Sequence, residues 1–143
     1  MIGEGEAVLP VRVAPEEFDR LVEKAVERIP ARFRRRMANI ALIVEARPTP
    51  EQLAGQGLRR PATLLGLYQG RPLSSRSVFE SFAMPDRILI FQQPHEDIAR
   101  DLDHLAGLVE ETVWHEIAHY FGMEEEQVRA AERRRRARAR LRR

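Results

Sequence analysis

Residues 108–126 read Leu-Val-Glu-Glu-Thr-Val-Trp-His-Glu-Ile-Ala-His-Tyr-Phe-Gly-Met-Glu-Glu-Glu and contain the motif H-E-x-x-H at His115, Glu116 and His119. Each residue of an α-helix turns by about 100°, so the two histidines lie about 40° apart on one face, one turn from each other. Two imidazoles placed in this way can each give a nitrogen to one tetrahedral Zn²⁺. Glu116 lies on the flank of that face, where its carboxylate can reach a water on the metal, as the general base of a zinc hydrolase does.

The residues after the motif support a metal site. Gly122 comes three residues after His119, where a glycine can adopt the left-handed conformation that ends a helix. One of the acids that follow, Glu124, Glu125 or Glu126, could then complete the site. The alternative is a helix with two exposed or hydrogen-bonded histidines and an ordinary glycine cap. The motif would arise by chance on the order of once per hundred such chains, and the glycine and acid lower that chance roughly another hundredfold, so we favour the metal site.

The segment H-E-I-A-H-Y-F-G-M-E-E resembles the metal-binding signature of the minimal zincin-like metallopeptidases, small single-domain bacterial proteins with H-E-x-x-H-x-x-G-x-x-D/E. The resemblance covers roughly residues 15–128. It implies that His115, His119 and Glu125 bind Zn²⁺ and that Glu116 is the base, with Glu124 and Glu126 as alternatives for the third ligand. Four other stretches resemble the same family: I-P-A-R-F-R-R-R (29–36), L-L-G-L-Y-Q-G (64–70), R-S-V-F (76–79) and P-D-R-I-L-I-F (85–91).

The function that the resemblance implies is a zinc-dependent metallopeptidase acting on a peptide or a small protein. Glu116 would take the proton of the attacking water and pass it to the leaving amine. Two alternatives stay open: a non-catalytic binding module stabilised by metal, and a zinc hydrolase directed to RNA by the arginine-rich C-terminal tail.

The composition and the charge distribution predict one domain over residues 1–128 and a tail over residues 129–143. The tail holds nine Arg and one acid, a net charge of +8, and residues 1–128 hold 15 basic and 21 acidic residues, a net charge of −6. The chain has no Cys, and no apolar run approaches the ~20 residues that span a membrane. The first ten residues carry Glu4 and Glu6 and no cationic segment, so we expect no secretory signal. We therefore expect a cytoplasmic monomer or weak oligomer.

The hydrophobic pattern predicts an α+β fold: a small mixed sheet of three to four strands, packed with an N-terminal helix, a long metal-binding helix and a C-terminal helix. We expect the N-terminal helix to begin at Pro15 and to end at Pro30. Residues 8–13 form an edge strand at best because they contain Pro10. Residues 40–44, which are all apolar, predict a strand in the middle of the sheet.

Further along the chain, residues 47–61 predict a loop with one helical turn that opens at Thr49. Strands are expected over residues 63–68, where Gly66 marks a bulge or a close approach, and over residues 87–92. A helical stripe runs from Ile98 to Phe121, and Gly107 separates an earlier helix from the metal helix. The loop 73–84 carries Ser74, Ser75 and Ser77, which lack the sequence context of nucleophiles.

Other polar residues have weaker functional interpretations. We expect His95 and His104 to lie at the surface or to cap helices. Tyr68 or His95 could stabilise the oxyanion, and the substrate would lie along residues 62–69 or 87–92 if either forms the sheet edge beside the metal helix. We interpret Arg34, Arg35 and Arg36 as a solvated face beside a buried Phe33, with a nucleic-acid or substrate patch as the alternative. The tail is a solvated helix, or it binds nucleic acid or an acidic partner without sequence specificity.

Overall fold

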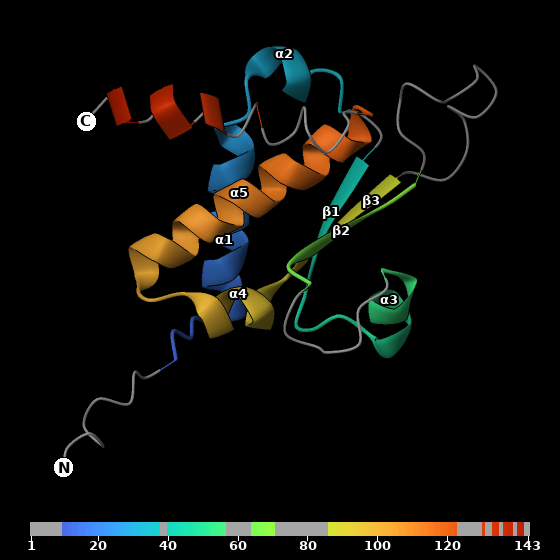
Figure 1. The fold of residues 1–143 in the computed structure, drawn as a ribbon, viewed down its shortest axis with the longest axis vertical. Coiled ribbons are helices and arrows are strands. Elements are labelled where there is room, and N and C mark those ends of the chain that lie inside the picture. Colours follow the sequence, from blue (N-terminus) through green and yellow to red (C-terminus); the bar gives the residue numbers. More distant parts are fainter. Residues whose placement is uncertain are drawn as a thin grey trace.

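The computed structural model describes residues 10–37, 40–56, 64–70 and 86–122, together with residues 130, 133–134, 136–138 and 140–141 of the tail. Within these residues the chain forms the predicted α+β fold (Figure 1). The helices are α1 (Pro15–Glu27), α2 (Ala31–Arg34), α3 (Pro50–Gly55), α4 (Gln92–Ile98) and α5 (Leu102–Tyr120). The strands are β1 (Ile40–Glu45), β2 (Gly66–Gln69) and β3 (Asp86–Phe91).

The three described strands form one mixed sheet in the order β1-β3-β2. β1 is parallel to β3, and β2 is antiparallel to it. The predicted central position of residues 40–44 is therefore wrong, because β1 is an edge strand and β3 lies in the middle. Residues 40–44 of β1 are all apolar because helices cover both faces of the sheet: Leu42 and Val44 pack on the side of α1 and α5, and Ile43 packs on the side of Leu53 in α3.

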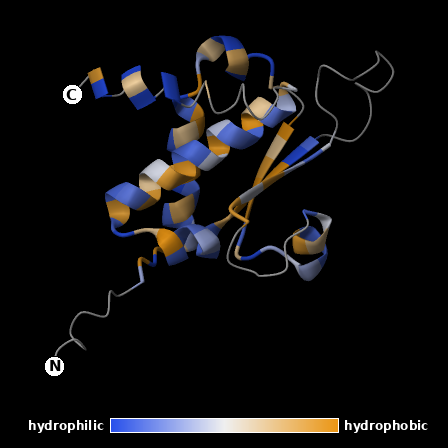
Figure 2. Ribbon diagram, in the orientation of Figure 1, coloured by the Kyte–Doolittle hydropathy of each residue, from blue (hydrophilic) through white to orange (hydrophobic). Residues whose placement is uncertain are grey.

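Two hydrophobic cores hold the sheet between helices. The larger core joins the sheet to α1 and α5 and contains the fully buried Phe18, Ile88, Ile90, Val109 and Val113. The smaller core lies on the opposite face of the sheet and consists of Leu64, Leu67, Leu89 and Phe91, packed against Ile43 and Leu53. Figure 2 shows the hydrophobic residues running along the strands and alternating with hydrophilic ones on α1 and α5. This alternation turns one side of each helix towards the sheet.

The sequence predicted the first residues of two helices correctly, from a proline in one case and a capping threonine in the other. α1 begins at Pro15, and its buried residues Phe18, Val22 and Ala25 follow the predicted helical spacing. α3 opens at Thr49, whose hydroxyl accepts from the Gln52 backbone N–H, while the Gln52 side chain accepts from the Thr49 N–H. This reciprocal capping satisfies two backbone donors that the helix leaves unpaired.

The break before the metal helix differs from the prediction. It lies between α4 and α5, and Gly107 is inside α5. Asp101 caps α5 by accepting a hydrogen bond of 2.7 Å from the His104 N–H, and His104 Nδ1 accepts one of 2.9 Å from the Arg100 N–H. His104 thus has the predicted capping role. Ile98 and Leu102, on either side of the break, are exposed, although their spacing continues the apolar stripe.

The described residues near the two ends of the chain form no strand of the sheet. Residues 10–14 form no strand, and residues 8–9 lie outside the described part, as does the loop with Ser74, Ser75 and Ser77. The described residues of the tail are helical, as predicted. Among the described residues, no helix has the length and apolar character needed to cross a bilayer.

Candidate metal centre and active site

The two histidines of the motif lie in the C-terminal half of α5 and converge on one point. His115 Nε2 and His119 Nε2 are 3.1 Å apart, and the ring centroids are 4.7 Å apart. Two nitrogens bound to one tetrahedral Zn²⁺ would be about 3.3 Å apart, given Zn–N bonds of about 2.05 Å. The separation of the two nitrogens is therefore close to the separation that a shared zinc ion requires.

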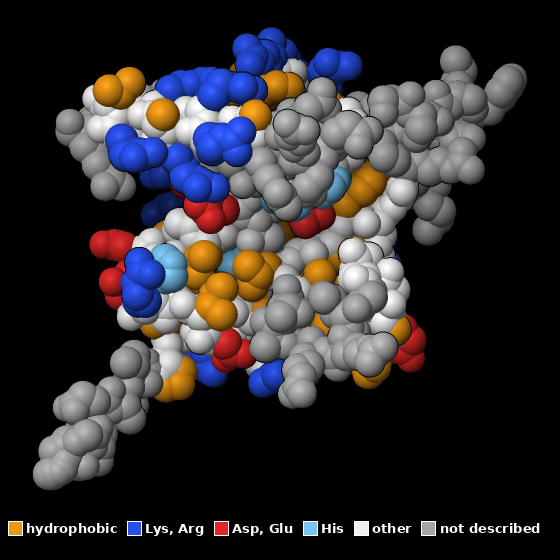
Figure 3. Space-filling model, viewed as in Figure 1, with side chains coloured by type: hydrophobic (Ala, Val, Ile, Leu, Met, Phe, Trp, Pro, Cys, Tyr) orange, Lys and Arg blue, Asp and Glu red, His pale blue; other side chains and the backbone are white. Residues whose placement is uncertain are grey.

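The helix keeps this pair at the surface of the domain. Val113 and Ile117 are buried in the large core, whereas His115 and His119 are only half-buried. The apolar stripe thus faces the sheet and leaves the histidines at its border, as the helical geometry predicted. Figure 3 shows histidine and acidic side chains next to each other where this face of the molecule is recessed.

The end of α5 turns the chain immediately after the second histidine. Gly122 has a φ of 78° and donates its N–H to the His119 carbonyl at 2.9 Å. A residue with a side chain would be strained at this φ, so the sequence uses glycine here, as predicted. The candidate third ligands Glu124, Glu125 and Glu126 lie outside the described residues.

The Glu116 side chain projects from α5 towards the edge strand β2. This side chain is buried, and a Cβ added to Gly66 of β2 would lie 3.2 Å from Glu116 Cγ and 2.7 Å from Thr112 Cγ2. The predicted close approach at Gly66 is confirmed, because only a residue without a side chain lets the strand pass this near to the helix. Glu116 is therefore enclosed by the strand on the flank of the histidine pair.

Strand β2 runs alongside α5, and alternate residues of the strand face successive turns of the helix. Gly66 faces Thr112 and Glu116, and the Tyr68 ring meets the Tyr120 ring at 6.1 Å, one helical turn further on. Of the two stretches that we considered for the sheet edge, residues 62–69 contain the edge strand, whereas residues 87–92 contain most of the central strand. An extended chain could pair only with the first of them.

Tyr68 does not present a free hydroxyl proton for the predicted oxyanion role. Its hydroxyl donates to Asp86 Oδ2 at 2.5 Å, and Asp86 is buried at the start of β3. This bond ties the end of β2 to the central strand. Asp86, which the sequence did not single out, is thus a structural partner of the edge strand.

His95 is wholly buried, so both its predicted surface position and its predicted oxyanion role are wrong. Its Nδ1 lies 2.6 Å from the Phe91 carbonyl and its Nε2 lies 2.8 Å from Thr112 Oγ1. Since a carbonyl only accepts, Nδ1 carries the proton, and Nε2 of the neutral ring accepts from the Thr112 hydroxyl. The hydroxyl proton is shared with the Leu108 carbonyl at 3.0 Å. His95 thus connects the end of β3 to α5, one turn before Glu116.

Burial also sets the protonation of His95. Desolvation lowers the pKa of its imidazole, and the Phe91 carbonyl and the charge of Glu96 only partly oppose that shift. Because the pKa is lowered, the ring stays neutral in the folded protein at neutral pH, and the neutral ring is compatible with both of its hydrogen bonds. Thr112 was not predicted to belong to the site; the only sequence signal was a polar residue within the apolar stripe of α5.

We expect acid to weaken the fold through His95. The ordinary pKa of a histidine is 6.5. As the pH falls below this value, His95 binds a proton in the unfolded chain, whereas in the folded chain it does so only at a lower pH. The neutral ring therefore makes its full contribution to the free energy of unfolding above about pH 6.5. This contribution decreases below that pH, by at most ~1.4 kcal/mol per pH unit. Urea denaturation between about pH 5 and 8, with a chelator present, should show a steeper loss for wild type than for His95→Gln. Equal slopes would contradict this assignment.

Comparison with known families agrees with this geometry. A family model described as zincin-like metallopeptidase matches residues 37–135, which include all three strands and the whole of α5. No curated protein matches the chain.

Proposed function

This chain belongs to the zincin-like metallopeptidase family, and we propose that it hydrolyses peptide bonds with Zn²⁺ held by His115, His119 and Glu125 and with Glu116 as the general base. The observation that carries the proposal is the convergence of the two imidazole nitrogens at 3.1 Å, with Glu116 beside them. Two neutral imidazoles and one carboxylate leave one position of a tetrahedral zinc open, as in catalytic sites.

The residues of the chain divide the chemistry between them. A bound Zn²⁺ would acidify a water and polarise the carbonyl of the scissile bond. The Glu116 carboxylate accepts the proton of the attacking water and delivers it to the leaving amine, so that one group serves as base and then as acid. Because β2 encloses Glu116 on one side, its carboxylate has few alternative positions, which favours a fixed orientation towards the histidine pair.

The substrate would bind as an extended strand along the outer side of β2. Among the described strands, β2 pairs only with β3, and the peptide backbone would form hydrogen bonds with its other side. Adding a strand to a sheet edge fixes a peptide mainly through its backbone. This mode places few demands on substrate sequence, so we expect short peptides of varied sequence to be cleaved.

Metal content tests the proposal directly. Wild type purified under mild conditions should contain close to one zinc per chain, and His119→Ala should contain almost none because it loses one of the two imidazole ligands. His104→Ala is a matched control, since it removes a histidine from the opposite end of the same helix and should keep the zinc. Elemental analysis measures all three. A wild type that fails to bind added Zn²⁺ would refute the site.

The same assay identifies the third ligand. Glu125→Gln should lower zinc affinity by about 100-fold or more, since even partners of metal ligands are worth 10- to 100-fold. Glu124→Gln and Glu126→Gln should keep the affinity of wild type. If one of these two loses zinc instead, the third ligand is that neighbour. A zinc-loaded wild type without turnover on a broad peptide panel would favour the non-catalytic module over the peptidase.

A further inference from the structure

A second feature of the molecule is a surface rich in arginine, which uses none of the side chains of the histidine pair. We call it the arginine surface, and Figure 3 shows blue, basic side chains gathered over the C-terminal tail and α2. All nine of its described arginines are exposed: Arg32, Arg34, Arg35 and Arg36 in and after α2, and Arg133, Arg134, Arg136, Arg138 and Arg140 in the tail.

The charge of the arginine surface is concentrated and poorly balanced. Two exposed arginines outside this surface meet carboxylates: Arg28 meets Glu110 at 2.8 Å and Arg12 meets Asp97 at 2.9 Å. The arginines of α2 and the two residues after it have no such partner among the described residues. Like charges this close repel one another, so the arrangement costs stability unless an anion binds.

Three of the four guanidinium groups in and just after α2 are held in place by neutral contacts. Arg32 stacks over the Phe33 ring at 4.9 Å, and Arg36 lies over the Phe121 ring at 5.7 Å. Arg34 Nε donates to the Ile29 carbonyl at 2.9 Å. Stacking and a single hydrogen bond leave most of the five N–H donors of a guanidinium free for a ligand. These groups are thus oriented without being neutralised.

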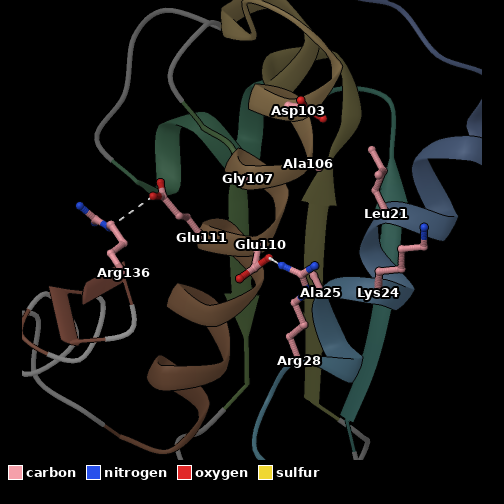
Figure 4. A pocket seen from close by; sticks show the side chains of 10 residues that line it. All are labelled: Leu21, Lys24, Ala25, Arg28, Asp103, Ala106, Gly107, Glu110, Glu111 and Arg136. Atoms are coloured by element: carbon pink, nitrogen blue, oxygen red, sulfur yellow. Dashed lines mark hydrogen bonds and ion pairs between the residues drawn. The ribbon is translucent and has the colours of Figure 1, made fainter. Parts of the chain in front are cut away.

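An ion pair connects a described residue of the tail to the domain. Arg136 Nε lies 3.4 Å from Glu111 of α5, at the rim of a groove of about 330 Å³ between α1 and α5 (Figure 4). Arg134 and Arg138 are offset from Arg136 by two residues along the helix, so they lie on other sides of it. One face of the tail is therefore anchored while other arginines face solvent.

We propose that the arginine surface binds the phosphate backbone of double-helical nucleic acid without reading its sequence. This inference is independent of the peptidase proposal, because it uses none of the residues of the metal site. The described helical residues of the tail lie between 130 and 141, a span of about 18 Å along a helix, and a duplex of that length carries about 11 phosphates. The sequence places six arginines between residues 130 and 141, which matches that linear charge density to within a factor of two.

The same residues argue against two other anionic partners. A helix that lies on a membrane needs a broad apolar face, and the described tail residues include only one large apolar side chain, Leu141. Unspecific binding of single strands needs aromatic rings for base stacking. The ring of Phe33 is instead covered by Arg32 and packs against Trp114 and Phe121. A regular duplex backbone is the partner that these features fit best.

The test compares two full-length variants with equal loss of charge. One carries Arg35→Gln, Arg134→Gln, Arg138→Gln and Arg140→Gln, all within the arginine surface. The matched control carries four changes at exposed arginines elsewhere: Arg20→Gln, Arg47→Gln, Arg87→Gln and Arg100→Gln. Binding to a labelled DNA duplex, an RNA duplex and a single strand, each of about 24 nucleotides per strand, is measured by fluorescence anisotropy from ~50 to ~200 mM salt.

Wild type and the control should bind both duplexes. The logarithm of the binding constant should fall linearly with the logarithm of the salt concentration, and each phosphate contact contributes about 0.9 to the size of that slope. The surface variant should bind at least about tenfold more weakly and with a slope shallower by up to ~3.6. Circular dichroism and zinc content check that both variants fold. Equal binding by the two variants would overturn the proposal. So would no duplex binding by wild type at low salt, tighter binding to the single strand, or binding to anionic vesicles alone.

Discussion

Glu116→Gln should keep one zinc per chain and lower the rate of peptide hydrolysis by about a hundredfold to ten-thousandfold. The amide has nearly the shape of the carboxylate, so it preserves the packing against Gly66 and leaves both imidazoles in place. It cannot accept the proton of the attacking water, because an amide is not a base at neutral pH. Zinc content and turnover on fluorogenic peptides, measured on the same preparation, separate the two effects.

A second glutamate of α5 serves as the control for this change. Glu111→Gln removes the same charge from the same helix, but Glu111 contacts Arg136 at the rim of the groove and lies away from β2. Its turnover on short peptides should stay within about twofold of wild type, as for surface changes outside a site. If Glu116→Gln keeps its turnover, Glu116 is not the base.

Gly66→Ala should destabilise the fold and slow catalysis together. The new methyl group would lie 2.7 Å from Thr112 Cγ2, too close for two carbon atoms, and also 3.3 Å from the Leu89 carbonyl oxygen. Overpacking of this kind costs about 1–3 kcal/mol. Because the methyl group would also push on the Glu116 side chain, we expect turnover to fall by about 10- to 100-fold. Urea denaturation and peptide turnover measure the two losses.

Two further variants locate the cause of that loss. Thr112→Ser removes the methyl group that meets the new side chain and keeps the hydroxyl that bonds to His95, so the double variant should recover part of the stability lost by Gly66→Ala. Gly107→Ala tests a glycine with open space around it on α5, and there alanine should stabilise the helix by about 0.5–1 kcal/mol. A Gly66→Ala protein as stable as wild type would refute the close contact.

The sequence predicted those features of the site that depend on a single helix. The spacing of His115 and His119 is a property of helical geometry, and Gly122 ends the helix through its own backbone conformation, so both were predicted correctly. Gly66 was recognised because a glycine inside a strand signals a close neighbour, although the identity of that neighbour, Thr112, depends on how β2 packs against α5.

The features that sequence reasoning placed wrongly depend on contacts between distant segments. The apolar run of β1 is equally compatible with a central strand and with an edge strand covered on both faces. Burial of His95 results from its hydrogen bonds to Phe91 and Thr112, which no local pattern reveals. The break before α5 was displaced because Ile98 and Leu102 continue an apolar spacing while facing solvent.

The position of the histidine pair along α5 has an electrostatic consequence. His119 lies in the last turn of this 19-residue helix. Aligned peptide dipoles give the C-terminal end of a helix about half a negative elementary charge, which favours a cation there by about 0.3–1 kcal/mol. The helix that carries the two imidazoles would therefore also attract the zinc ion through its backbone. The same two histidines placed in the first turn, beside Asp101, would meet the positive end and lose that attraction.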